Sequence, residues 1–240
     1  MLSGLWLLFF GILLVVILSS FPLSSMADPQ TIIITTPNDE EDDELGYEKN
    51  DDEDFEQENS IRICCAWGNA LADGRLTYYI NDEDSSEKQQ EAVRDAIEEW
   101  DKNINPVELE ESSNKKGSDI RVDFKGDNEL DVAGQTMNTF DRHGFTGKVE
   151  ITIFKETSDY NFNNAVIEQI AEHEVGHALG LGHANFDGNI MAAQINDGTD
   201  TISECEISGV FEANRWYLQD NDDGSNIPEN PRYDTIACDR

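Results

Sequence analysis

One short segment contains three histidines and a glutamate at the spacing of a metal centre. In His173-Glu-Val-Gly-His177-Ala-Leu-Gly-Leu-Gly-His183, the first two histidines are four residues apart. On a helix they project from one face, so both imidazoles can reach a single ion. Gly180 would end that helix and let His183 return to the same ion. Nitrogen ligands suit Zn²⁺, and three protein ligands leave one coordination position open, as catalytic zinc sites do.

Glu174 follows the first histidine and is displaced from it by about 100° around the helix. Its carboxylate can therefore approach a water molecule at the metal without being a ligand itself. Zinc lowers the pKa of such a water towards about 7 and polarises a carbonyl group. Glu174 can then take a proton from the water and pass it to a leaving amine, as general base and acid. These roles together predict hydrolysis of peptide bonds in a protein or peptide substrate.

The segments around the motif have the periodicity of an α+β domain. Behind a capping box at Ser86 and Gln89, apolar residues recur at helical spacing to about Lys102. Alternating apolar residues predict strands, and two further apolar stripes predict an active-site helix and a C-terminal helix. The predicted strands span residues 76–80, 120–124, 133–140 and 149–153, and the predicted helices span 86–102, 164–179 and 203–217. This order predicts a mixed, twisted sheet in a folded domain of residues 61–219, followed by an irregular polar tail at 220–240.

The N-terminus carries an apolar run typical of an export signal. Leu5 to Leu18 is an unbroken run of 14 residues without charge. A helix that spans a membrane needs roughly 20, so we favour a signal peptide over residues 1–27, cleaved after Ala27. The run is preceded by no Lys or Arg, and an uncleaved membrane anchor stays open as the alternative. The first interpretation predicts a secreted protein, and the second predicts a catalytic domain anchored outside the cell by this segment alone.

The chain is strongly acidic, with a formal net charge of −35 at pH 7. Asp39 to Glu58 alone holds 13 acidic residues and one lysine, and it has too few apolar residues to pack. We therefore predict a disordered acidic spacer over residues 28–60, with a propeptide or a weak cation-binding tract as alternatives. Such a charge excludes binding of nucleic acid through its phosphates and attracts cations, among them Ca²⁺. We expect a monomer.

Four cysteines lie outside the apolar N-terminus, which suggests two disulfides in an exported chain. They are Cys64, Cys65, Cys205 and Cys238. Adjacent cysteines rarely pair with each other because the geometry is strained. We therefore expect Cys64 and Cys65 each to bridge to one of the other two, which would tie the start of the domain to its end.

The pattern HExxHxxGxxH resembles that of the metzincin metallopeptidases, and within them it is most similar to the matrixins. The likeness covers about residues 66–218. It implies a zinc-dependent endopeptidase with a metzincin-like fold, in which Met191, eight residues after His183, forms the Met-turn beneath the zinc ligands. It also implies that the strand near residues 133–140 is the edge strand that pairs with an extended substrate.

Several matrixin features are missing. Cys64 and Cys65 lack the PRCGxPD context of the cysteine switch, and only His143 remains where the family places structural-zinc histidines. Ala193-Gln194-Ile195 replaces the Pro-x-Tyr that shapes the specificity pocket, so substrate preference does not transfer. A second functional class stays open, namely a non-enzymatic acidic surface protein that binds cations and holds a structural zinc. That protein would have no need of a general base at Glu174.

Overall fold

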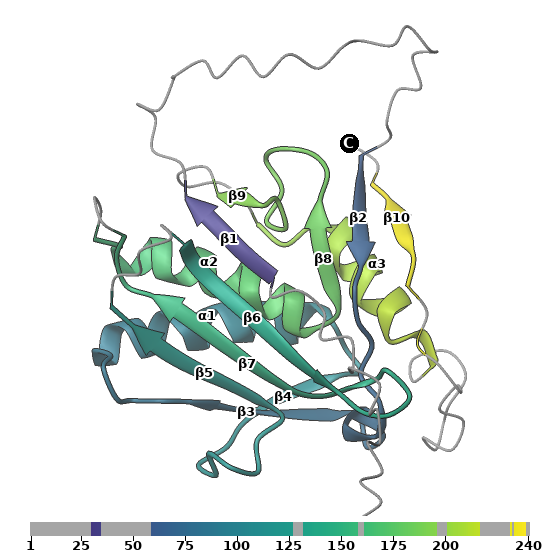
Figure 1. Ribbon diagram of the computed structural model, residues 1–240, viewed down its shortest axis with the longest axis horizontal. Coiled ribbons are helices and arrows are strands. Elements are labelled where there is room, and N and C mark those ends of the chain that lie inside the picture. The colour runs from purple at the N-terminus through teal and green to yellow at the C-terminus, as the bar shows by residue number, and fades with distance from the viewer. Residues whose placement is uncertain are drawn as a thin grey trace, which may run out of the picture.

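The computed structural model describes residues 30–34, 59–126, 132–157, 161–195, 201–216, 231 and 233–238. In these parts the chain forms a mixed sheet, a smaller second sheet and three α-helices (Figure 1). The expected α+β class is therefore confirmed. The expected signal peptide or anchor at residues 1–27 lies outside the described residues. Across the part of the chain that is described, no helix has both the length and the apolar character to cross a membrane.

The larger sheet has the strand order β4-β3-β5-β7-β6-β1-β9. Neighbours among β3, β4, β5 and β7 pair in parallel, whereas β6 pairs antiparallel to β7. The four strands predicted from alternation are β3, β5, β6 and β7. Strands β4 and β9 are too short or too polar for periodicity to reveal them, and β1 is a β-branched run without alternation. The bounds are β1 (Gln30–Ile34), β3 (Arg75–Ile80), β4 (Glu108–Glu111), β5 (Ile120–Lys125), β6 (Val132–Phe140), β7 (Thr146–Phe154) and β9 (Gln194–Ile195).

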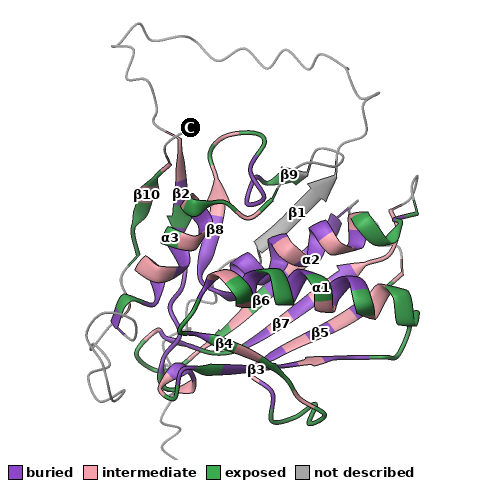
Figure 2. Ribbon diagram, turned by 180° about the vertical axis from the view of Figure 1, so that it is seen from behind, coloured by how far each residue is buried: buried purple, intermediate pink, exposed green. Residues whose placement is uncertain are grey.

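Two helices, α1 (Glu87–Asn103) and α2 (Asn164–Ala178), cover the same face of this sheet (Figure 2). The predicted capping box at Ser86 is present. The buried residues of α1 are those of its predicted apolar stripe, Ala92, Val93, Ala96, Ile97 and Trp100. The Trp100 indole is fully buried and donates a hydrogen bond of 2.8 Å to the backbone carbonyl of Glu172, so it joins α1 to α2.

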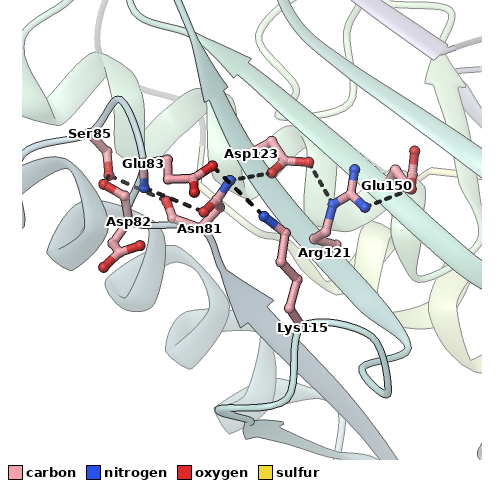
Figure 3. Close-up of polar contacts among 8 residues, drawn as sticks. All are labelled: Asn81, Asp82, Glu83, Ser85, Lys115, Arg121, Asp123 and Glu150. Atoms are coloured by element: carbon pink, nitrogen blue, oxygen red, sulfur yellow. Dashed lines mark hydrogen bonds and ion pairs between the residues drawn. The ribbon is translucent and has the colours of Figure 1, made fainter.

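The opposite face of the sheet is polar, as the alternation predicts. The Arg121 side chain donates to Asp123 at 2.6 Å and pairs with Glu150 on the neighbouring strand at 3.1 Å (Figure 3). The amide of Asn81, just after β3, donates to the second oxygen of Asp123. These side chains let the sheet keep one face against the helices and the other in water.

The smaller sheet has the order β10-β2-β8 and is antiparallel throughout. It consists of β2 (Ser60–Ile63), β8 (Leu181–Ala184) and β10 (Thr235–Ala237). A short 3-10 helix, η1 (Asn69–Leu71), follows β2. The C-terminal helix α3 (Glu204–Ala213) begins after the N-cap Ser203, as expected, and ends four residues before the predicted Tyr217.

Two stretches that we expected to be irregular contain strands. Residues 30–34 of the acidic segment form β1, and residues 235–237 of the polar tail form β10. β10 forms the edge of the smaller sheet, and β1 lies between β6 and the two-residue β9. Both pair through backbone groups, which accept another strand whatever its apolar pattern. The acidic tract at residues 39–58 lies outside the described residues, as do residues 220–230.

The expected disulfide pairing is wrong. Cys205 pairs with Cys238, their Cα atoms 5.4 Å apart, and Cys64 pairs with Cys65. The pairing of β10 with β2 places Cys238 beside the first turn of α3, whereas Cys64 and Cys65 turn away towards Gly180. The start and end of the domain are still joined, but by the backbone hydrogen bonds between β2 and β10.

Replacing Trp100 with alanine should lower the free energy of unfolding by about 3–5 kcal/mol, because it leaves a cavity between α1 and α2. The exposed Lys88 on the same helix is the matched control, and Lys88→Ala should change stability by less than about 0.5 kcal/mol. Urea unfolding followed by circular dichroism measures both values. Equal stability of the two variants would contradict the packing described here.

Candidate metal centre and active site

Helix α2 supplies the first two histidines and the glutamate of the predicted motif. Asn163 caps its start, its side chain accepting a hydrogen bond from the Val166 N–H. The helix ends at Ala178, whose carbonyl accepts a hydrogen bond of 2.8 Å from the Trp67 indole. Gly180 then adopts a φ of +112°, a conformation that favours glycine, and the chain turns into β8. Strand β8 carries His183 back towards the helix, as the spacing predicts.

The structure brings the three histidines together. One ring nitrogen each from His173, His177 and His183 lies within 4.8 Å of the other two. The centroids of the His173 and His177 rings are 4.5 Å apart, and those of His177 and His183 are 4.9 Å apart. In the described part of the chain, no second group of three or more metal-binding side chains lies this close together.

Backbone carbonyls orient two of these rings. His173 Nδ1 lies 2.5 Å from the carbonyl oxygen of Ile190, and His177 Nδ1 lies 2.8 Å from that of Leu181. A carbonyl can only accept, so each Nδ1 carries the proton and each Nε2 presents its lone pair. The Nε2 atoms of His173 and His177 are buried without a hydrogen-bond partner. Buried lone pairs that converge in this way fit a zinc ion, whose histidine ligands usually donate their other nitrogen to such carbonyls.

Two of the histidines are also kept neutral. Burial lowers the pKa of His173 to about 3 and moves the pKa of His177 well below its usual value. A metal ligand must be unprotonated, so no proton has to leave these two rings when a metal binds near neutral pH.

Glu174 follows His173 on α2, is fully buried, and contacts β6. The Thr136 hydroxyl donates to its Oε2 at 2.6 Å, while its Oε1 is buried without a partner. Gly134 leaves room for the carboxylate, because a Cβ at that position would overlap Glu174 Oε1. Burial raises the pKa of Glu174 well above its usual value, and the Thr136 hydrogen bond opposes that shift. One carboxylate oxygen thus accepts from Thr136, and the other is buried next to Gly134 without a hydrogen-bond partner.

Met191 is fully buried beneath α2, where its sulfur fills the space that a Cβ on Gly176 would occupy. Its N–H donates to the Asn189 side chain, and its carbonyl accepts from the Ala184 N–H at 2.8 Å. This segment is therefore attached to β8, and the residue before it supplies the carbonyl that orients His173. Met191 thus packs against the helix that carries the first two histidines, and its role as a Met-turn stays a prediction.

Of the other residues considered, His143 and the two adjacent cysteines lie outside the histidine group, whereas Thr136 and Gly134 belong to the site without having been predicted. His143 is exposed in a turn, lies next to Arg142 and does not join the histidine group. The Cys64–Cys65 pair contacts the backbone of Gly180 and also stays outside that group. Thr136 and Gly134 were not predicted as site residues. A strand predicted at residues 133–140 contained them, but nothing local in the sequence places that strand against Glu174.

Comparison with known proteins agrees with this geometry. The family model for the matrixins matches residues 66–212. A curated relative, matrix metalloproteinase-19 from Homo sapiens, is 31% identical over 110 residues, which cover 42% of this chain and 20% of the relative. The chain thus spans about a fifth of the length of that relative.

The purified chain should bind about one Zn²⁺. His183→Ala should weaken that binding by more than about 100-fold, because loss of a group that only hydrogen-bonds to a metal ligand already costs about 10–100-fold in metal affinity. The matched control is His143→Ala, which removes the fourth histidine without touching the site. Competition with a zinc-binding dye gives the affinities. Equal losses for the two variants would place the metal elsewhere.

Proposed function

The chain belongs to the matrixin family, and from this we propose that it is a zinc-dependent endopeptidase acting on proteins or peptides. The observation that carries the proposal is the buried Glu174 carboxylate, which follows His173 on α2. One of its oxygens accepts from Thr136, the other is buried without a hydrogen-bond partner, and the same helix carries two of the three converging histidines. A site that only stored zinc would not require a buried carboxylate at that point, because burying an ionisable group costs free energy.

We propose that His173, His177 and His183 hold the catalytic zinc. When bound there, zinc supplies a Lewis acid that polarises the scissile carbonyl and acidifies a coordinated water. The side chains and backbone of the protein transfer the proton and hold the reacting groups in position. The Oε1 of Glu174 takes a proton from the attacking water and passes it to the leaving amine. Thr136 keeps the carboxylate in place, and the Ile190 and Leu181 carbonyls keep the imidazoles aligned.

The edge of β6 is our candidate for the surface that binds the substrate backbone. Its residues 134 and 136 touch Glu174, so a peptide running along that edge would pass the catalytic carboxylate. Main-chain pairing of this kind gives affinity with little regard to side chains. Ala193 and Gln194 stand where the family has its Pro-x-Tyr, so we assign no preference for a particular side chain.

We further propose that the protein acts outside the cell as a monomer with one zinc. The apolar run at Leu5–Leu18 and the Cys205–Cys238 disulfide both suit an exported chain. A non-enzymatic acidic protein with a structural zinc is the weaker proposal, because such a protein would have no use for a carboxylate buried at Glu174. Calcium binding by that tract stays a prediction.

Replacing Glu174 with alanine should abolish peptide hydrolysis while the chain keeps its zinc, because the histidine ligands are untouched. Hydrolysis of a quenched fluorescent peptide and metal analysis measure the two properties. The matched control is Glu172→Ala on the same helix, whose side chain faces a groove against α1 rather than the histidines. Full activity of the Glu174 variant would refute the mechanism.

Replacing Gly134 with alanine should lower kcat/KM by about 100-fold, because the new Cβ displaces the Glu174 carboxylate from its position and small misplacements of this kind are costly. Zinc affinity should be unchanged. Gly147 on the adjacent strand β7 is the matched control, since a Cβ there would meet only ordinary contact at 3.7 Å. The kinetics of Gly147→Ala should match those of the wild type, and a similar loss in both variants would point to a general effect on the sheet.

A further inference from the structure

The candidate substrate edge is occupied by a segment of the same chain. Strand β6 pairs with β7 on one side and with β1 on the other. Strand β1 pairs in turn with β9, in parallel, through Ile33 with Gln194 and Ile34 with Ile195. Figure 1 shows β1 between β6 and β9. The five residues of β1 therefore fill the place of a strand that β6 and β9 would otherwise offer to a peptide.

The register places β1 at the catalytic carboxylate. Ile32 lies opposite Gly134 and Gln30 lies opposite Thr136. These two residues of β6 are the ones that contact Glu174. On its other edge, β1 pairs with a strand that begins three residues after Met191. The segment thus runs along both strands that border the histidine site, at the level of the site itself.

We infer that residues 30–34 are a tethered peptide ligand of the catalytic groove, which keeps the enzyme latent by competing with substrate for β6 and β9. This inference rests on the proposed function, because latency has meaning only for an active peptidase. The segment holds no cysteine, so backbone pairing does the blocking rather than a thiol at the metal. It is the intramolecular form of strand addition to a sheet edge.

The composition of the segment suits this role. Gln30-Thr-Ile-Ile-Ile34 contains four consecutive β-branched residues, which favour an extended backbone. The tether strengthens it further. A ligand segment in the same chain as its site acts at an effective concentration that reaches the order of 1 mM, so an external peptide at micromolar concentration competes poorly. A cut anywhere between β1 and β2 would separate the segment from the domain and remove that advantage.

The test uses the full chain with proline at Ile32 and, in a second variant, at Ile33. Adjacent residues of a strand direct their N–H groups to opposite neighbours, so one variant weakens the pairing to β6 and the other the pairing to β9. The matched control is Asp43→Pro in the acidic tract, which introduces the same residue outside the strand. Zinc content and thermal unfolding establish that each variant is folded.

Each variant is measured in two ways. The value of kcat/KM for a short quenched peptide should rise at least about tenfold in the strand variants and stay constant in the control. Hydrogen exchange should show the amides of residues 132–136 protected in the wild type and exchanging faster in the strand variants. The amides of β7 should be unaffected.

The outcomes separate the two proposals. Unprotected amides on the outer edge of β6 in the wild type would overturn the inference without any variant. Unchanged kcat/KM in both strand variants, with faster exchange and a measurable wild-type rate, would also overturn it. If exchange changes as expected but no chain cleaves any peptide and all retain zinc, the proposed function fails while the occupation of the groove stands.

Discussion

The hydrogen bonds from the imidazole Nδ1 atoms to two backbone carbonyls are the interactions on which the site depends. His173 and His177 are fully buried, and each needs a partner for its N–H in the dry interior. The Ile190 and Leu181 carbonyls supply it, and in doing so they direct both Nε2 lone pairs to one point. Both carbonyls come from segments that follow α2 in the chain. The metal centre therefore forms only when those segments fold back onto the helix.

Several contacts hold the chain in place where it turns back after α2. The end of α2 is fixed by the Trp67 indole and by the Asn214 side chain, which donates to the Leu179 carbonyl at 2.9 Å. Gly180 makes the turn, and β8 then pairs with β2, which is itself held by β10. The C-terminal strand thus supports the third histidine from two strands away. The expected disulfide would have served the same purpose, and strand pairing replaces it.

The same backbone pairing that builds the domain also supplies its candidate regulator. A sheet edge next to a catalytic carboxylate binds any extended chain that reaches it, because main-chain groups do not distinguish sequences. In this protein residues 30–34 reach it first. A strand edge that binds substrate cannot be paired permanently with another strand of the domain. A strand of the same chain that can be removed covers this edge until substrate is to bind.

The sequence by itself determined which residues form the candidate metal centre. Spacing around a helical turn decided that His173 and His177 share a face, and Gly180 marked the turn to His183, because both are properties of local backbone geometry. Periodicity likewise located both long helices and the four strands that alternate. Only the tertiary structure decided which groups surround Glu174, which cysteines pair and where residues 30–34 lie. Thr136, Gly134, the Cys205–Cys238 pair and β1 all depend on contacts between segments far apart in the chain. Such contacts depend on backbone hydrogen bonds and on how side chains fit together. Neither can be recognised from the residue types within one short segment.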